Sequence, residues 1–322
     1  MVPNQPLVFG GNGQKLTEDA ITAFSWQKFL TSGDESWPLR LPMTKSVVRA
    51  MDAITSFCAS PAGGGLAVDK FVLGGASKRG WTAWTTAAVD SRVVAIIPGV
   101  IDPLNLEPSF EHHYRSYGFW APAIAEFERA GITRWAGTPQ FAALIRSEDP
   151  YSYRDRLTMP MFHRQCRRRP IFSARLLKGE FVDAAESIAS FYQSILSDTP
   201  RPSFSWNFAD DGSIRVRTES KPSAVRLWQA ENANARDFRL ASIGAAYTSW
   251  SLSDQGDGLY VGMVPQPKQG WTAYFVEMTF PTGGPYSFKF TTGVRVTPDR
   301  LPFGPPPETE GGCENVPSAS SP

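Results

Sequence analysis

The sequence contains little cysteine and little histidine. Its 322 residues include three cysteines, Cys58, Cys166 and Cys313, and three histidines. Three widely spaced cysteines cannot form a disulfide framework, and their spacing matches no zinc-binding pattern. We therefore expect no metal site and no bound cofactor, and a mechanism that needs an imidazole has few candidates.

Long apolar runs and an excess of one charge are also missing. No run reaches the roughly 18 apolar residues of a membrane-spanning helix, so we expect no membrane span. The 32 Lys and Arg balance 31 Asp and Glu, a net charge of +1, whereas nucleic-acid binders usually carry a basic excess. The run Arg167-Arg168-Arg169 has no interleaved aromatics, so we interpret it as a solvated stretch and expect no nucleic-acid partner.

The two ends have simple interpretations. Residues 1–6 contain no basic stretch followed by an apolar run, so no signal peptide is visible. If the chain is complete, this predicts a cytoplasmic protein. Residues 301–322 are rich in Pro, Gly, Ser and Glu and lack periodicity, which predicts a disordered tail.

Residues 1–199 are predicted to form mainly helices with a few apolar strands, and hence an α/β domain. Residues 71–73 and 93–97 are apolar strand candidates on either side of a helical stretch, residues 81–89. Such a strand–helix–strand unit has the right length for a parallel pair. Two amphipathic helices are also expected. The first is capped by Thr44 and buries Val47, Met51, Ile54 and Cys58, and the second spans 183–196 and buries Ala184, Ile188, Phe191 and Ile195.

The spacing of apolar residues changes in residues 200–300. Ile214 and Val216 alternate with arginines, and so do Val225 and Leu227. Further strand candidates are 259–264, 271–280 and 286–296, separated by glycine-containing turns. Several short strands at this spacing predict a smaller antiparallel β-sandwich-like domain of about 100 residues, a module that more often binds or supports than catalyses.

One motif contains a candidate catalytic residue. Gly75-Ala76-Ser77-Lys78-Arg79-Gly80 lies between a predicted strand and a predicted helix, the setting of a nucleophile elbow. The sharp turn needs small residues on both sides of the serine, and the backbone N–H of Lys78 would point at a developing oxyanion. Arg79 takes the second place after Ser77 and Gly80 the third, so the spacing departs from G-x-S-x-G. The alternative is a tight strand-to-helix turn with a helix-capping serine.

Several stretches share a pattern with a known family, namely residues 3–7, 41–45, 50–52, 74–81, 149–157, 235–239 and 270–273. On these stretches the sequence resembles the PhoPQ-activated pathogenicity-related proteins, which include autocrine proliferation repressor-like proteins. The resemblance extends over about nine tenths of the chain. It implies an α/β-hydrolase-like domain, a β-rich C-terminal region, export from the cell and a serine nucleophile at Ser77.

The chain departs from the family pattern at two places. The amino-terminal part, with the export signal, the first strands and a second oxyanion donor, is missing, so a truncated sheet with an exposed apolar edge is expected. After Pro160 the family continues with a Gly-Asp turn bearing the acid and an Asp-His segment bearing the base. Residues 161–182 instead hold a cluster of arginines, and look like out-of-frame or wrongly spliced sequence.

A serine hydrolase needs a base and an orienting carboxylate, so we looked for substitutes. Asp102 follows the second strand, and should therefore lie at the same sheet edge as Ser77. His112 and His113 begin ten residues later, and His113 could serve as the base, cap the site or bind substrate. His163 lies inside the aberrant stretch and is interpreted as a solvated loop residue.

Three hypotheses follow. In the first, the protein is a serine hydrolase of esterase or peptidase type that acts on a small-molecule ester or peptide, with Ser77, Lys78, Asp102 and His113 as site residues; the chain as written is expected to be inactive. In the second, it is a non-catalytic secreted signalling or binding protein with a protein partner. In the third, it is an incomplete gene product. We expect residues 1–199 to form an incomplete α/β-hydrolase-like domain and residues 200–300 the β-rich one.

Overall fold

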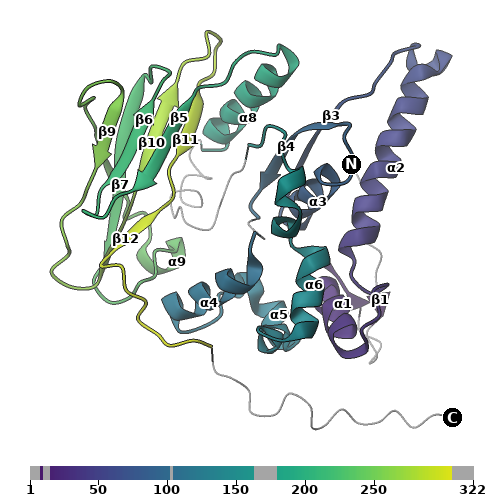
Figure 1. Ribbon diagram of the computed structural model, residues 1–322, viewed down its shortest axis with the longest axis horizontal. Coiled ribbons are helices and arrows are strands. Elements are labelled where there is room, and N and C mark those ends of the chain that lie inside the picture. Colours follow the sequence, from purple (N-terminus) through teal and green to yellow (C-terminus); the bar gives the residue numbers. More distant parts are fainter. Residues whose placement is uncertain (1–7, 10–14, 102–103, 163–179, 307–322) are drawn as a thin grey trace. The chain divides into compact units, whose positions relative to one another are not determined.

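The computed structural model describes residues 8–9, 15–101, 104–162 and 180–306 (Figure 1). The chain divides into two compact units. The first comprises residues 1–39, 105–148 and 302–322, and the second residues 40–104 and 149–301. The domain boundary expected near residue 200 falls inside the second unit, and it stays a prediction. The expected tail lies outside the described residues from 307 onward.

The first unit is mainly helical. Trp26 and Phe29 of α1 are buried, and the Trp26 ring packs at 5.1 Å between centroids against Phe127. Phe110 and Phe141 add a second aromatic contact at 6.2 Å. The elements are β1 (Val8–Phe9), β2 (Lys15–Leu16), α1 (Glu18–Ser32), α4 (Leu106–Tyr117), η2 (Pro122–Ile124), α5 (Ala125–Arg129), η3 (Ile132–Trp135) and α6 (Pro139–Glu148).

The expected strand–helix–strand unit is confirmed in the second unit. Strands β3 (Phe71–Ala76) and β4 (Val93–Gly99) pair in parallel, with helix α3 (Lys78–Ala87) between them in sequence. A parallel bridge from Ile96 to Met161 adds a third chain segment beside β4. Parallel strands end at the same edge, so Ala76 and Gly99 are register partners there.

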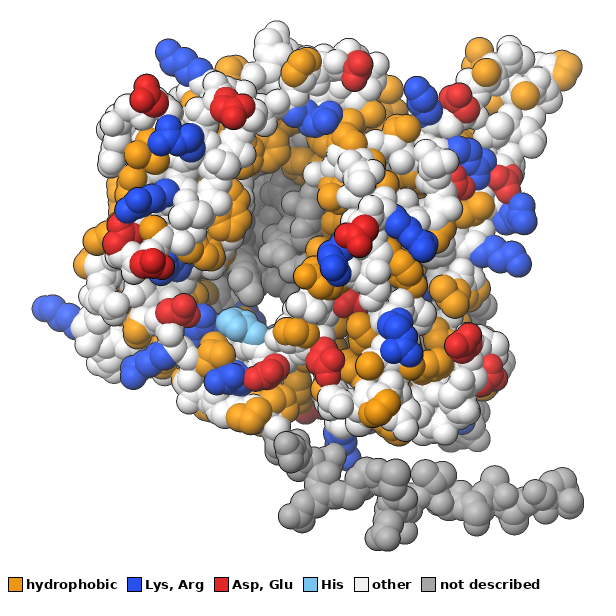
Figure 2. Space-filling model, viewed as in Figure 1, with side chains coloured by type: hydrophobic (Ala, Val, Ile, Leu, Met, Phe, Trp, Pro, Cys, Tyr) orange, Lys and Arg blue, Asp and Glu red, His pale blue; other side chains and the backbone are white. Residues whose placement is uncertain are grey.

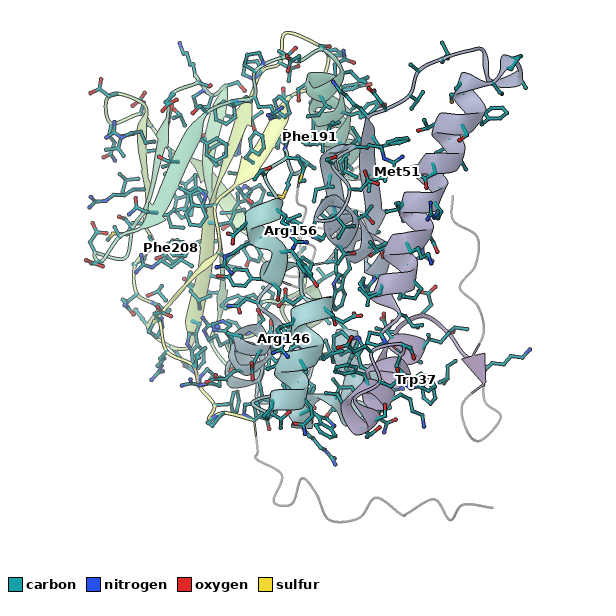
Figure 3. The ribbon with its side chains drawn as sticks, turned by 45° about the vertical axis from the view of Figure 1, so that its right-hand side comes forward. Trp37, Met51, Arg146, Arg156, Phe191 and Phe208 are labelled. Carbon is teal, nitrogen blue, oxygen red and sulfur yellow. The ribbon has the colours of Figure 1, made fainter. Side chains whose placement is uncertain are left out.

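Helix α2 (Arg40–Ala59) differs from the expectation. Thr44 lies one turn inside the helix and does not cap it, because the helix begins at Arg40. The buried face carries Arg40, Thr44 and Met51, whereas Ile54 is exposed. Figure 3 labels Met51, which belongs to a core cluster with Trp84 and Ile96. The predicted inward stripe is right at Met51 and wrong at Ile54, while Val47 and Cys58 are half-buried. The burial of Arg40 and Thr44 was not predicted, because a purely hydrophobic stripe cannot reveal polar positions.

The antiparallel strands from residue 204 onward form two sheets. One has the order β5-β6-β9, and the other β11-β10-β7-β8 with β12 also paired to β10. The expected strand 271–280 matches β10, whereas 286–296 is two strands, β11 and β12. Strands β5 and β8 were not expected. The bounds are β5 (Phe204–Phe208), β6 (Ile214–Thr218), β7 (Ala224–Asn232), β8 (Thr248–Ser251), β9 (Leu259–Gly262), β10 (Trp271–Phe280), β11 (Phe288–Thr291) and β12 (Arg295–Thr297), with α9 (Leu240–Ile243) between β7 and β8.

One hydrophobic core joins these sheets to the parallel pair. Val216 of β6 and Leu227 of β7 are buried in the same cluster as Ala95 of β4. Phe191 of α8 (Glu180–Leu196), labelled in Figure 3, belongs to this cluster, and its ring lies tilted against Phe162 with 5.5 Å between the centroids. Ile188 and Ile195 also pack against it, which confirms the inward face predicted for this helix apart from Ala184, whose side chain is outside the described residues.

The fold is therefore mixed α/β, with one parallel and several antiparallel pairings. Figure 2 shows Lys and Arg side chains interspersed with Asp and Glu on the visible face. Across the described ranges, none of the helices is both long enough and apolar enough to cross a bilayer. Two short 3₁₀ segments, η1 (Pro61–Gly63) and η4 (Pro150–Arg156), complete the second unit.

Candidate functional site

Ser77 occupies the turn between β3 and α3 in a strained backbone conformation. Its φ of 55° and ψ of −132° lie where a residue with a side chain rarely sits. The Ser77 N–H donates to the Gly99 carbonyl at 2.9 Å, and the Ser77 carbonyl accepts from the Trp81 N–H at 3.0 Å. Although Ser77 precedes the first residue of α3, its side chain makes no capping hydrogen bond. The Ser77 side chain therefore does not cap α3 in this structure.

Two glycines make the turn possible. A Cβ on Gly75 would stand 2.7 Å from the Arg79 backbone carbon. A Cβ on Gly80 would stand 2.7 Å from Ile101 Cγ2 and 2.8 Å from the Gly75 carbonyl oxygen. Because such approaches are closer than carbon atoms tolerate, the spacing Gly75–Ser77–Gly80 is a steric requirement of this turn.

A second strained residue lies at the same sheet edge. Val100 directly follows β4 and has a φ of 58°, which is a genuine outlier for a β-branched side chain. Its neighbour Gly99 accepts the hydrogen bond from Ser77. Backbone strain of this kind is concentrated at functional sites, because the surrounding structure must hold it.

Lys78 and Arg79 begin helix α3. Lys78 is buried, with 5% of its surface exposed, whereas Arg79 is exposed. The N–H groups in the first turn of a helix have no partner within that helix, and they favour an anion at its N-terminus. The Lys78 amide can therefore donate to a negative oxygen that develops beside Ser77.

Sequence reasoning missed Arg40. This residue begins α2, is only 1% exposed, and donates from Nη1 to the Lys78 carbonyl at 2.7 Å and to Thr82 Oγ1 at 3.0 Å. Its guanidinium carbon lies 4.3 Å from the centroid of the Trp81 ring. The available signal was its position immediately before the stretch 41–45, which carries the family resemblance.

Of the candidate acid and base residues, His113 is the one that lies in the described part of the chain. Asp102 and His163 lie outside the described residues, and so does most of the stretch 161–182. His113 belongs to the first unit, where its Nε2 accepts from the Ala121 N–H at 3.0 Å and its ring stacks at 5.8 Å on Trp120. That nitrogen is thus engaged locally. Within the described part of the chain, no group of three or more His, Cys, Asp or Glu side chains could hold a metal ion.

The motif at 235–239 has a structural role. Asp237 is buried and accepts twice from the Arg239 guanidinium, at 2.8 and 2.6 Å. Burial raises the pKa of this carboxyl, but the hydrogen bonds from Arg239 outweigh burial and the net pKa lies below its ordinary value. The Asn232 side chain donates to the Asp237 carbonyl, and Gly270 lies so close to Asn232 that a Cβ would not fit. These contacts fix a loop and do not form a reactive site.

The fold and the site define a mixed α/β protein with a strained serine at a strand-to-helix turn. The family model of the PhoPQ-activated pathogenicity-related protein matches residues 1–164 and 176–239. The chain belongs to this family. The match is interrupted at 165–175, inside the stretch where the sequence departs from the expected pattern.

A named relative supports this assignment. The chain is 32% identical over 352 aligned residues to autocrine proliferation repressor protein A of Dictyostelium discoideum. The alignment covers 94% of this chain and 71% of the relative. No solved structure matches the chain significantly.

Proposed function

We propose that Ser77 is the nucleophile position of a serine-hydrolase-like site of esterase or peptidase type. The observation that carries the proposal is the backbone of Ser77, which is strained at φ 55° and ψ −132° while its hydroxyl leaves the helix uncapped. A serine that merely begins a helix adopts an extended backbone and bonds to an N–H of the first turn. Ser77 does neither, so the strain at this position is not explained by helix capping.

The chemistry of such a site is acyl transfer. The Ser77 Oγ attacks the carbonyl carbon of a small ester or peptide, a base takes the hydroxyl proton, and the carbonyl oxygen becomes an oxyanion facing the Lys78 amide. When this intermediate collapses, the bond to the alcohol or amine breaks, and that leaving group takes the proton from the base. The α/β-hydrolase arrangement is the scaffold we propose for it, because the strand, turn, helix and parallel strand follow in the required order. Asp102 and His113 remain the candidate acid and base.

Fluorophosphonate labelling tests the proposal. The probe should form an adduct with the parent chain, and Ser77→Ala should abolish it. The control is Ser60→Ala, because Ser60 caps η1 by accepting from the Gly63 N–H at 3.2 Å and is a true capping serine. Labelling that survives in Ser77→Ala, or none on the folded parent chain, would overturn the proposal.

A second candidate function rests on the relative's name. The Dictyostelium protein is called a proliferation repressor, so we propose as an alternative that this chain is exported and represses proliferation by binding a protein partner. Purified chain added to dividing cells should then slow their growth. If Ser77→Ala slows growth equally, binding is sufficient. If Ser77→Ala loses the effect while remaining folded, the nucleophile is required and the non-catalytic alternative fails.

A further inference from the structure

We infer that Arg40 is a positioning residue that sets the first turn of α3, and through it the surroundings of the side chain at position 77. The inference deepens the proposed function, because it concerns the residue that holds the nucleophile turn. Arg40 contacts three residues of that turn region: Lys78 through its carbonyl, Thr82 through its hydroxyl, and Trp81 through its ring.

Several contacts restrict the backbone at Lys78. The Lys78 carbonyl accepts from Arg40 Nη1 at 2.7 Å and from Thr82 Oγ1 at 3.0 Å. The guanidinium carbon also lies 4.3 Å from the centroid of the Trp81 ring in the same turn. A planar group with several donors suits this combination better than a flexible ammonium. Arg40 therefore fixes the carbonyl of the residue that directly follows Ser77.

Arg40 also links the turn to a second helix. One turn further along α2, Thr44 Oγ1 lies 2.6 Å from Thr85 Oγ1 of α3. Beyond it, Met51 and Trp84 share an apolar cluster. The two helices are consequently held in a single register, with Arg40 bonded to the residue that directly follows Ser77. A shift of α3 along α2 would break both polar contacts at once.

The test uses a thiol at position 77, so that it does not depend on hydrolase activity. Ser77→Cys is made in a chain whose three native cysteines are replaced by serine, and the rate of alkylation by iodoacetamide is measured against pH. The thiolate is the reacting form, and oriented amides at a helix N-terminus lower the pKa of a thiol from about 8.5. The midpoint of the pH profile therefore reports how the first turn of α3 faces position 77.

We expect Arg40→Met to raise that midpoint and to slow alkylation at pH 7 about threefold to tenfold. Arg40→Lys keeps the charge but not the planar contacts, so it should restore the rate only in part. The matched control is Arg49→Met on the same helix, where the side chain is 72% exposed and pairs with Asp52. That substitution should leave both rate and midpoint unchanged.

The outcomes separate the possible roles. A lower melting temperature with an unchanged pH profile in Arg40→Met would show a merely structural role and overturn the inference. Full restoration by Arg40→Lys would show that charge alone acts, and would overturn it as well. If Arg40→Met does not fold, Arg40→Lys and Thr82→Val take its place in the test. Each should raise the midpoint of the pH profile by a smaller amount than we expect for Arg40→Met. If Ser77 resists fluorophosphonate but the thiol introduced by Ser77→Cys responds to Arg40, the hydrolase proposal fails and the positioning role stands.

Discussion

Thr44 on α2 and Thr85 on α3 share a buried hydrogen bond, with 2.6 Å between their Oγ1 atoms. Either hydroxyl can donate in this pair. Because Thr85 also reaches the Thr82 carbonyl at 3.2 Å as a donor, we assign Thr44 as the donor and Thr85 as the acceptor. The arrangement places a polar contact where two helices of an α/β core usually meet through apolar side chains. Its position, one turn from Arg40, makes it part of the framework that holds the Ser77 turn.

The pair predicts an asymmetric response to substitution. Thr85→Val leaves the buried Thr44 hydroxyl without this acceptor, and we expect it to lower the free energy of unfolding by about 1–3 kcal/mol. Thr44→Val should cost less, because Thr85 keeps its bond to Thr82. The double variant should cost less than the sum of the single ones. Urea denaturation of the four proteins measures this, and equal, additive losses would contradict the assigned donor and acceptor.

Gly80→Ala tests the steric requirement of the turn. The new Cβ would meet Ile101, the Gly75 carbonyl and the Gly99 nitrogen, all within 3.2 Å. Overpacking of this kind typically costs about 1–3 kcal/mol, and a displaced turn should also lose fluorophosphonate labelling. Gly304→Ala is the control, since nothing lies within 4 Å of the position of its Cβ. A Gly80→Ala chain with parental stability and labelling would show that the turn is less constrained than we describe.

The Asp237–Arg239 pair predicts a particular dependence of stability on pH. The folded-state pKa of Asp237 is lowered, although burial opposes this, because Arg239 donates to both carboxylate oxygens. The stabilisation is therefore complete above the unfolded-state pKa of about 4 and is lost as pH falls through the lower folded-state value. Asp237→Asn should melt at a lower temperature than the parent at pH 7.

The difference between these two melting temperatures should shrink as pH falls below about 4. Thermal melts of both chains at a series of pH values provide the measurement. A difference that stays constant down to about pH 2 would mean that Asp237 is not the titrating group. Asp155→Asn is a suitable control, since the Asp155 side chain is 93% exposed and its ion pair with Arg154 spans 3.9 Å.

Much of the second unit could be predicted from sequence, because apolar residues recur at regular spacing along several of its helices and strands. The alternation of Ile214 and Val216 with arginines matches strand β6, in which buried and exposed residues alternate. The glycine spacing around Ser77 identified the turn, because only small residues allow so close an approach. Strand β5 was missed since most of its residues are exposed, among them Trp206 and Phe208, so it shows no alternating pattern.

The contacts of Arg40 could not have been predicted from sequence. A buried arginine is rare, and its partners Lys78 and Thr82 lie 38 and 42 residues away. The inward face of α2 was predicted only in part for the same reason, because its buried positions include Arg40 and Thr44. Polar contacts between helices produce no regular spacing in the sequence, so only the folded structure shows which residues are in contact.

The most direct test of the central claim is a burst measurement with an activated p-nitrophenyl ester. If Ser77 is a nucleophile whose acid and base segment is incomplete, mixing should release about one nitrophenolate per chain, followed by slow or no turnover. The acyl group should map to the peptide that contains Ser77, and Ser77→Ala should show no burst. A folded chain that gives no burst, or an acyl group on another residue, would contradict the assignment of Ser77 as the nucleophile.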